Sequence, residues 1–226
     1  MRIASAAAFV LISIAGTSAA PAADRIVVDP NDPPWNAIAK VQTNIGTRCT
    51  GVLIAPATVL TAAHCLYNPR TRALLEPVSL HVLLGYQRGE YRWHRFVARL
   101  AVGPGFEGGK GPPTSDWARL ELAEAIPNAV APLLMAQAEP APGMAVILAG
   151  YSQDRMQLLL ADPSCHVIRM IGTSGGRLIA HDCAATRGTS GAPLLAQEDR
   201  GWAVLGINLA AGKEMNLALS ASGIER

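Results

Sequence analysis

Short segments that alternate between apolar and polar residues recur along the whole chain, and this pattern restricts the possible folds more than any other feature. Such segments occupy residues 36–54, 58–60, 78–100 and 117–122, and others follow from about residue 132 onward. None of these stretches has the long helical repeat that alternating strands and helices would need. With 21 glycines and 16 prolines available for turns, the pattern predicts an all-β protein built as a sandwich or barrel.

The stretch Ile126-Pro127-Asn128 resembles a linker between two halves of similar size. We expect residues 24–125 to form an N-terminal β domain and residues 126–226 a C-terminal one. A chain of 226 residues can bury roughly 70% of its unfolded surface. Its length therefore allows one large or two small domains.

The first 23 residues have the features of a secretory signal peptide. Arg2 precedes an apolar run at residues 6–14, and Ala20-Pro21-Ala22 provides the small residues of a cleavage site. A membrane anchor would need about 20 strongly apolar residues, and Ser13, Thr17 and Ser18 dilute this N-terminal stretch. We therefore expect an exported protein, periplasmic or secreted, with no membrane contact once the signal peptide is removed.

The chain has four cysteines, at positions Cys49, Cys65, Cys165 and Cys183. An even number in an exported chain favours disulfides over a metal site, and no CxxC pair is present, so we expect no metal. Four cysteines allow three pairings. The two local pairs would close loops of similar length and stabilise the fold by roughly 3 kcal/mol each.

The balance of charged residues excludes one class of partner. The 19 lysines and arginines nearly match the 17 aspartates and glutamates, for a net charge of +2. Proteins that bind nucleic acid present a strongly basic face. We therefore expect no nucleic-acid partner.

The first segment that contains a candidate catalytic residue is Thr61-Ala62-Ala63-His64-Cys65. His64 follows a predicted strand and precedes a cysteine whose disulfide would hold the backbone in place. A single histidine is most often structural. Here the small neighbouring residues and the adjacent disulfide favour an imidazole ring that is held in a fixed position for catalysis.

The second segment is Ser115-Asp116-Trp117-Ala118-Arg119-Leu120. Period-two alternation places Asp116 on the apolar face with Ala118 and Leu120. Placing a carboxylate among buried apolar side chains costs free energy unless the carboxylate is paired or hydrogen-bonded. An imidazole N–H would be a suitable partner, because the carboxylate would set its tautomer. The alternative is an aspartate that caps a loop.

The third segment is Arg187-Gly188-Thr189-Ser190-Gly191-Ala192-Pro193. A serine hydroxyl is a weak nucleophile without a base. Flanking glycines allow a tight turn whose N–H groups converge on one point. Such an oxyanion hole is worth about 3 kcal/mol of transition-state stabilisation per donor.

A competing motif is Gly172-Thr173-Ser174-Gly175-Gly176, which fits the G-x-S-x-G nucleophile elbow of α/β-hydrolases. That motif requires a strand-to-helix turn with an acid and then a histidine downstream. Here His181 precedes Asp182, and no helical pattern follows Ser174. We expect a hairpin turn instead.

The three segments occur in the order His, Asp, Ser, and together they resemble the chymotrypsin-like (trypsin-fold) serine peptidases. The stretches Cys49–Pro56 and His181-Asp182-Cys183 are most similar to the bacterial branch that includes the glutamyl endopeptidases. The similarity spans roughly residues 26 to 218, nearly all of the chain after the signal peptide.

The resemblance implies two packed antiparallel β-barrels with the active site in the cleft between them. Ser190 would be the nucleophile, His64 the general base and then acid, and Asp116 the orienting carboxylate. The backbone N–H groups of Gly188 and Ser190 would form the oxyanion hole. We expect no cofactor. The resemblance also implies two disulfides: Cys49–Cys65 beside the histidine, and Cys165–Cys183 near the specificity pocket.

Several positions depart from the family pattern. Thr189 stands where trypsin-like zymogens have an aspartate that pairs with a newly cut N-terminus, although Arg25-Ile26 still resembles a processing site. Ala184, at the pocket floor, lacks the acid that would bind lysine or arginine. Ala185 and Asn208 stand where glutamyl endopeptidases have a hydroxyl residue and a histidine. We therefore expect the substrate residue before the cut bond to be small or apolar.

These features together predict a serine endopeptidase that acts as a monomer on protein or peptide substrates through an acyl-enzyme intermediate. A non-catalytic binding protein with a peptidase fold is the alternative from another functional class. Such proteins usually lack one member of the triad, and all three are present here. An esterase would use the same chemistry on a different substrate.

Overall fold

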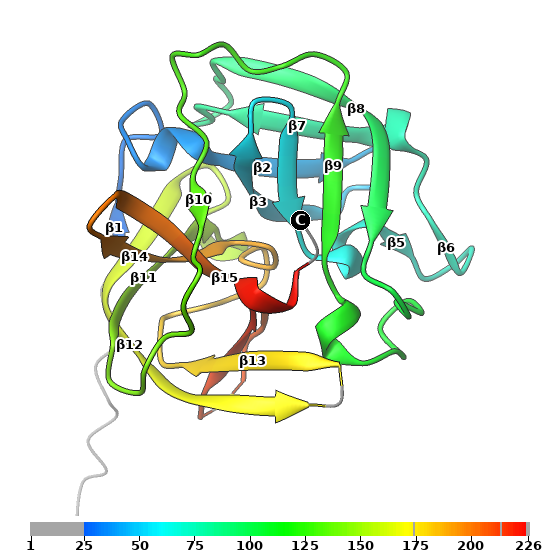
Figure 1. Ribbon diagram of the computed structural model, residues 1–226. Helices are drawn as coiled ribbons and strands as arrows, with labels where there is room; N and C mark the ends of the chain where they lie inside the picture. The colour runs from blue at the N-terminus through cyan, green and yellow to red at the C-terminus, as the bar shows by residue number, and fades with distance from the viewer. Residues whose placement is uncertain (1–24, 174, 213, 225–226) are drawn as a thin grey trace, which may run out of the picture.

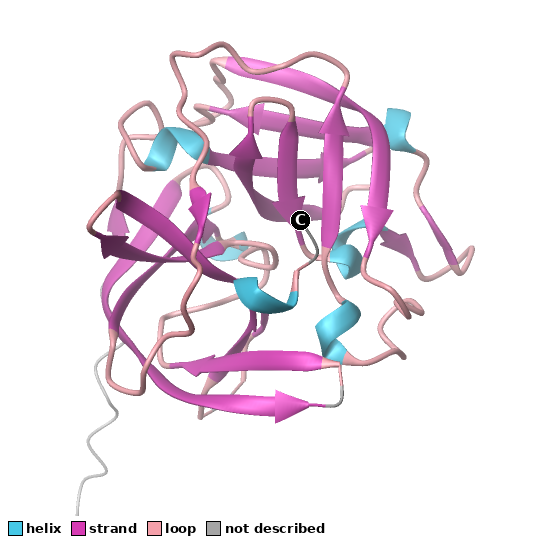
Figure 2. Ribbon diagram, viewed as in Figure 1, coloured by secondary structure: helices cyan, strands magenta, loops and turns pink. Residues whose placement is uncertain are grey.

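A computed structural model describes residues 25–173, 175–212 and 214–224 (Figure 1). The predicted signal peptide at residues 1–23 and Ser174 of the competing motif lie outside the described residues. Strands dominate the described ranges (Figure 2), which confirms the predicted all-β class. The helices are 3₁₀ turns of three or four residues: η1 (Trp35–Ala37), η2 (Ala63–Leu66), η3 (Pro77–Ser79), η4 (Pro113–Ser115), η5 (Gln153–Arg155) and η6 (Ala221–Gly223). Among the described helices, none has the length and apolarity needed to cross a membrane.

The first barrel closes through antiparallel strands in the order β2-β3-β4-β9-β8-β7. These strands are β2 (Ile38–Thr43), β3 (Arg48–Ala55), β4 (Thr58–Thr61), β7 (Leu80–Leu84), β8 (Trp93–Val102) and β9 (Ala118–Leu122). The alternating stretch at residues 36–54 is not one strand, because β2 and β3 form a hairpin that turns at Gly46, where φ is +89°. This φ lies in the left-handed region that glycine adopts without strain. A separate two-stranded sheet joins β5 (Tyr67–Asn68) to β6 (Ala73–Leu74).

The second barrel closes in the order β11-β14-β15-β16-β13-β12, with β12 paired back to β11. Its strands are β11 (Ala145–Tyr151), β12 (Leu159–Thr173), β13 (Gly176–His181), β14 (Pro193–Glu198), β15 (Gly201–Ala210) and β16 (Asn216–Ser220), and β10 (Leu134–Met135) adds parallel to β15. Thr173 pairs with Gly176, so β12 and β13 form the hairpin expected in place of a nucleophile elbow. The two closed antiparallel barrels confirm the chymotrypsin-like fold.

The short strand β1 (Ile26–Val27) pairs with β12 of the second barrel, although it precedes the first barrel in the sequence. A domain division at residues 24–125 places β1 with the first barrel, whereas its backbone hydrogen bonds attach it to the second. Two residues are too few to specify a partner by apolar alternation, so the sheet edge that is available decides where β1 binds.

Apolar side chains fill both barrels and the contact between them. One buried cluster runs from Ile38 and Leu60 in the first barrel to Leu159 and Val204 in the second, while a smaller cluster around Leu194 fills the second barrel. Burial of this apolar area is the main stabilising term. Because the larger cluster is continuous, the two barrels have a fixed relative position.

Two disulfides each join elements of one barrel. Cys49 of β3 bonds to Cys65 of η2, and Cys165 of β12 bonds to Cys183, which follows β13. Of the three ways to pair four cysteines, the structure has the one that joins the cysteines closest to each other in the sequence. The first bridge fixes the helix that bears His64 against the first barrel.

Candidate active site

His64 lies on η2, directly after β4, where the chain leaves the first barrel. Its neighbours Ala63 and Cys65 are buried, so the backbone cannot shift without opening the core. The imidazole side chain is 35% exposed. The backbone that carries the imidazole ring is therefore held in place, while the ring itself remains accessible to a substrate.

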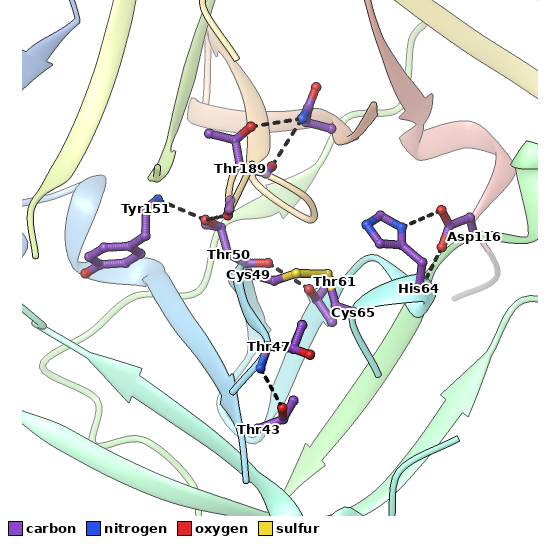
Figure 3. Close-up of a disulfide and its surroundings, with 12 residues drawn as sticks. Thr43, Thr47, Cys49, Thr50, Thr61, His64, Cys65, Asp116, Tyr151 and Thr189 are labelled. Atoms are coloured by element: carbon purple, nitrogen blue, oxygen red, sulfur yellow. Dashed lines mark hydrogen bonds and ion pairs between the residues drawn. A yellow bond between two sulfur atoms is a disulfide. The ribbon is translucent and has the colours of Figure 1, made fainter. Parts of the chain in front are cut away.

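Asp116 follows η4 and lies two residues before the start of β9, and it contacts His64 at two points (Figure 3). Its Oδ2 lies 2.7 Å from Nδ1 of the ring, and its Oδ1 accepts the backbone N–H of His64 at 2.8 Å. When Nδ1–H donates to this carboxylate, Nε2 at the other side of the ring holds the lone pair and can accept a proton. The expected pairing of Asp116 with an imidazole is thus present in the structure.

Ser190 lies in the tight turn that precedes β14, and this turn rests on the first barrel. The carbonyl of Ser190 accepts the backbone N–H of Thr50 at 2.9 Å. At Gly191, a Cβ would lie 2.3 Å from the carbonyl oxygen of Thr50 and 2.8 Å from the backbone nitrogen of Ala62. Only glycine allows this approach, which brings the serine turn beside the segment that leads into His64.

The Ser190 side chain is half-buried, and within the described part of the chain its hydroxyl has no hydrogen-bond partner. The structure therefore joins His64 to Asp116 by a hydrogen bond, but it joins Ser190 to this pair only through the backbone packing. Hydrogen bonds of a catalytic serine often form fully only when substrate is bound.

The peptide groups on both sides of Gly188 are held by hydrogen bonds. The carbonyl of Arg187 accepts the N–H of Gln153 at 2.6 Å, and the carbonyl of Gly188 accepts the hydroxyl of Thr50 at 2.9 Å. In a trans peptide the N–H points opposite to the carbonyl, so the N–H of Gly188 points away from Gln153. Gly188 has φ +95°, and a Cβ there would lie 2.4 Å from the carbonyl oxygen of Tyr151.

Thr50 is a buried residue of β3 that the sequence analysis did not single out. Its side chain donates to Gly188 and accepts the N–H of Tyr151 at 2.9 Å, while its carbonyl accepts the hydroxyl of Thr61 at 2.7 Å (Figure 3). Together with its N–H bond to Ser190, these contacts connect the two barrels at the candidate site. Thr50 is 0% exposed, so each of these polar groups depends on its protein partner.

Cys49, His64 and Cys65 place potential ligand atoms within 4.8 Å of one another. A metal would need thiolate ligands, and both sulfurs are joined in the disulfide. The sulfurs are therefore not available as thiolate ligands, and the bridge anchors η2, which carries His64, to β3.

Comparison with known families identifies the chain. The profile of the trypsin-like peptidase domain matches residues 49–207, well over half of the chain. The chain belongs to the trypsin-like peptidase family. This assignment confirms the resemblance found in the sequence, and it makes the protein a serine endopeptidase by family, with proteins or peptides as substrates. One similar solved structure is that of a Glu endopeptidase in complex with MPD, with a TM-score of 0.73 and 24% sequence identity over 87% of this chain and 90% of that chain. At this identity, the match shows the shared fold.

The predicted specificity-pocket residues of this trypsin-like peptidase differ in accessibility. Ala184 and Ala185 are partly exposed, and the N–H of Ala184 donates to Asp162 at 2.7 Å. Asn208 is only 2% exposed. Its Nδ2 lies 3.2 Å from both the carbonyl oxygen and Oγ1 of Thr189, so its amide is already used within the protein.

The Oδ1 of Asn208 lies 3.1 Å from Nε2 of His181, a histidine that sequence reasoning did not connect to the site. His181 is fully buried, and its Nδ1 has no partner among the described residues. Burial lowers the pKa of His181 to about 4, although the hydrogen bond to Asn208 opposes this shift. A neutral His181 therefore supports Asn208, which in turn supports Thr189 beside the candidate nucleophile of the peptidase.

Proposed function

We propose that this protein is an exported serine endopeptidase that cleaves peptide bonds with a triad of Ser190, His64 and Asp116. The observation that carries the proposal is the double contact of Asp116 with the ring and the backbone of His64. It orients Nε2 as the proton acceptor. The turn that bears Ser190 packs against the segment before His64, which supports a shared site for nucleophile and base.

In the proposed mechanism, Nε2 of His64 takes the proton of the Ser190 hydroxyl as Oγ attacks the substrate carbonyl carbon. The carbonyl oxygen becomes an oxyanion that accepts hydrogen bonds from the N–H groups of Gly188 and Ser190. The C–N bond then breaks, and the protonated His64 gives its proton to the leaving amine. The acyl group stays on Ser190 until water, deprotonated by His64, attacks the ester carbon. The C–Oγ bond then breaks, His64 returns the proton to Oγ of Ser190, and the acid is released.

The pocket composition supports a small or apolar substrate residue before the cut bond. Ala184 and Ala185 offer methyl groups, and the amide of Asn208 is bound to Thr189 and His181. A charged substrate side chain placed there would lose its hydration without gaining a charged partner. We expect strict cleavage after glutamate, lysine or arginine to be absent.

Features of the N-terminal sequence and the two disulfides support an exported location. Residues 1–23 have signal-peptide features, and two disulfides suit an oxidising compartment. We propose that the mature enzyme works in the periplasm or outside the cell, as a monomer.

The proposal is tested by digesting a peptide library with the mature protein and with Ser190→Ala in parallel. We expect cleavage by the wild type at sites with small or apolar residues before the bond, and no cleavage by the variant. A fluorophosphonate reagent, which forms a covalent bond with activated serines, should label the wild type only. Equal inactivity of the two proteins, with no labelling, would support the binding-protein alternative.

A further inference from the structure

A cavity of about 220 Å³ lies where the two barrels meet, directly beside Gly188. Lys40 and Arg48 line it from the first barrel, and Tyr151, Gln153 and Arg187 line it from the second. It shares Gly188 with the proposed oxyanion hole but none of the residues Ala184, Ala185 and Asn208. The cavity is therefore separate from the pocket for the residue before the cut bond.

The charge of this cavity is strongly one-sided. Lys40, Arg48 and Arg187 contribute three cationic groups, and none of the described residues that line the cavity is acidic. Asp154, which follows the lining residue Gln153 in the sequence, is held by Arg25 through hydrogen bonds that lower its pKa. No acidic residue among those that line the cavity therefore neutralises its positive charge.

Lys40 is unusual because it is a lysine with only 1% exposure. Its Nζ donates to the carbonyl of Met156 at 2.7 Å and lies 3.7 Å from the ring centroid of Tyr86. An ammonium has three donors, and the described residues offer it a carbonyl and aromatic rings but no carboxylate. Burial and the charge of Arg48 lower its pKa to about 8. A bound carboxylate would favour the charged form again.

The proposed mechanism gives the substrate a direction relative to this cavity. In that mechanism the scissile carbonyl points at the N–H of Gly188, and the residue before the bond is assigned to Ala184 and Ala185. Because the cavity borders Gly188 but neither of these alanines, it is assigned to the residues after the bond.

We propose that this cationic pocket binds a carboxylate on the leaving-group side of the scissile bond, so that the enzyme prefers substrates that are acidic there. The carboxylate can belong to an acidic side chain or to the C-terminus of the substrate. This inference rests on the proposed peptidase function and specifies its substrate class.

The test uses matched peptides that share one sequence before the cut bond. One series has glutamate or glutamine at the first, second or third position after the bond, with an amidated C-terminus. A second series is neutral and ends two or three residues after the bond, as a free acid or as an amide. We expect kcat/KM to be about tenfold higher for the acidic member at one position at low ionic strength, and we expect this gain to shrink in about 0.5 M salt.

A gain in the first series would show that the bound carboxylate belongs to an acidic side chain, and a gain in the second series would show that it belongs to the C-terminus. Equal rates for all pairs would overturn the proposal.

Variants then locate the effect. Arg48→Gln and Arg187→Gln should each lower the ratio of acidic to neutral kcat/KM about threefold, and the double variant should bring it close to one. Lys40→Met, which keeps the length of the buried stem, should also lower the ratio. Arg200→Gln, on the exposed turn between β14 and β15, removes the same charge elsewhere and should leave the ratio unchanged. An equal loss in Arg200→Gln would assign the preference to net charge and contradict the pocket.

A binding measurement separates this inference from the proposed function. The Ser190→Ala protein is mixed with the fluorescently labelled glutamate and glutamine peptides, and fluorescence polarisation reports their affinities. Tighter binding of the acidic peptide by Ser190→Ala would support the pocket even if the wild type cleaved nothing. Cleavage by the wild type with no acidic preference in either assay would leave the peptidase intact and reject the pocket.

Discussion

The hydroxyl of Thr50, in the first barrel, donates a 2.9 Å hydrogen bond to the carbonyl of Gly188, in the second. The same hydroxyl accepts the N–H of Tyr151, and the backbone N–H of Thr50 donates to Ser190. One buried residue thus fixes the segment that carries both the proposed oxyanion donors and the proposed nucleophile.

Replacing Thr50 by valine removes this hydroxyl at nearly constant volume. The carbonyl of Gly188 and the N–H of Tyr151 would be left without partners, which costs about 1–3 kcal/mol of stability. Because the oxyanion loop would lose a support, we expect kcat to fall about 10- to 100-fold with little change in KM. Steady-state kinetics and urea unfolding measure both effects. Thr50→Ser keeps the hydroxyl and should restore kcat, and a Thr50→Val enzyme with wild-type kcat would contradict the positioning role.

Asp116→Asn keeps the size of the side chain but removes its charge. An amide can donate to Nδ1 of His64, which would place the imidazole proton on Nε2 and block its action as a base. We expect kcat to fall by about 10⁴-fold, while the circular dichroism spectrum stays that of the wild type. Asp199→Asn, on the exposed β14–β15 turn, is the matched control and should retain activity. Comparable activity of Asp116→Asn and the control would exclude Asp116 from the triad.

His181 should make the stability of the protein fall in acid. Its pKa is about 4 in the folded state, against about 6.5 in an unfolded chain. Between these values the unfolded state binds more protons, so the free energy of unfolding decreases as the pH falls from about 6.5 to 4. The contribution of this residue amounts to about 3 kcal/mol. Denaturant unfolding at a series of pH values should show a weaker acid dependence for His181→Gln than for the wild type. Identical pH profiles would mean that His181 is not buried in its neutral form.

The mature N-terminus should lie before Arg25. The Arg25 guanidinium donates to Ser152 at 2.8 Å and to Asp154, and Ile26 pairs with Ala161 of β12. Proteolysis is favoured in exposed, unpaired segments, so these contacts protect the Arg25–Ile26 bond. N-terminal sequencing of the exported protein should find Arg25 retained. A mature chain that starts at Ile26 would show that this bond is a processing site after all.

Features encoded by neighbouring residues could be predicted from the sequence. Apolar alternation within single strands predicted the all-β class, and the segments around His64 and Ser190 carried the family resemblance that the trypsin-like peptidase profile confirms. The disulfides join cysteines 16 and 18 residues apart, so local loop closure favours them. Where two strands were joined by a short turn, as at residues 36–54, the alternation alone did not show the break at Gly46.

The tertiary structure decided which distant groups meet. Thr50 bonds to Gly188 across 138 residues, Lys40 bonds to Met156 across 116, and His181 supports Thr189 through Asn208. The sequence by itself determined the all-β class, the family and the residue types of the proposed triad, because these depend on local backbone periodicity and on short motifs. The oxyanion-loop support, the partner of β1 and the cationic pocket depend on the packing of one closed barrel against the other. That packing is set by the shared apolar core as a whole, and no local pattern specifies which buried polar groups it brings within hydrogen-bond distance.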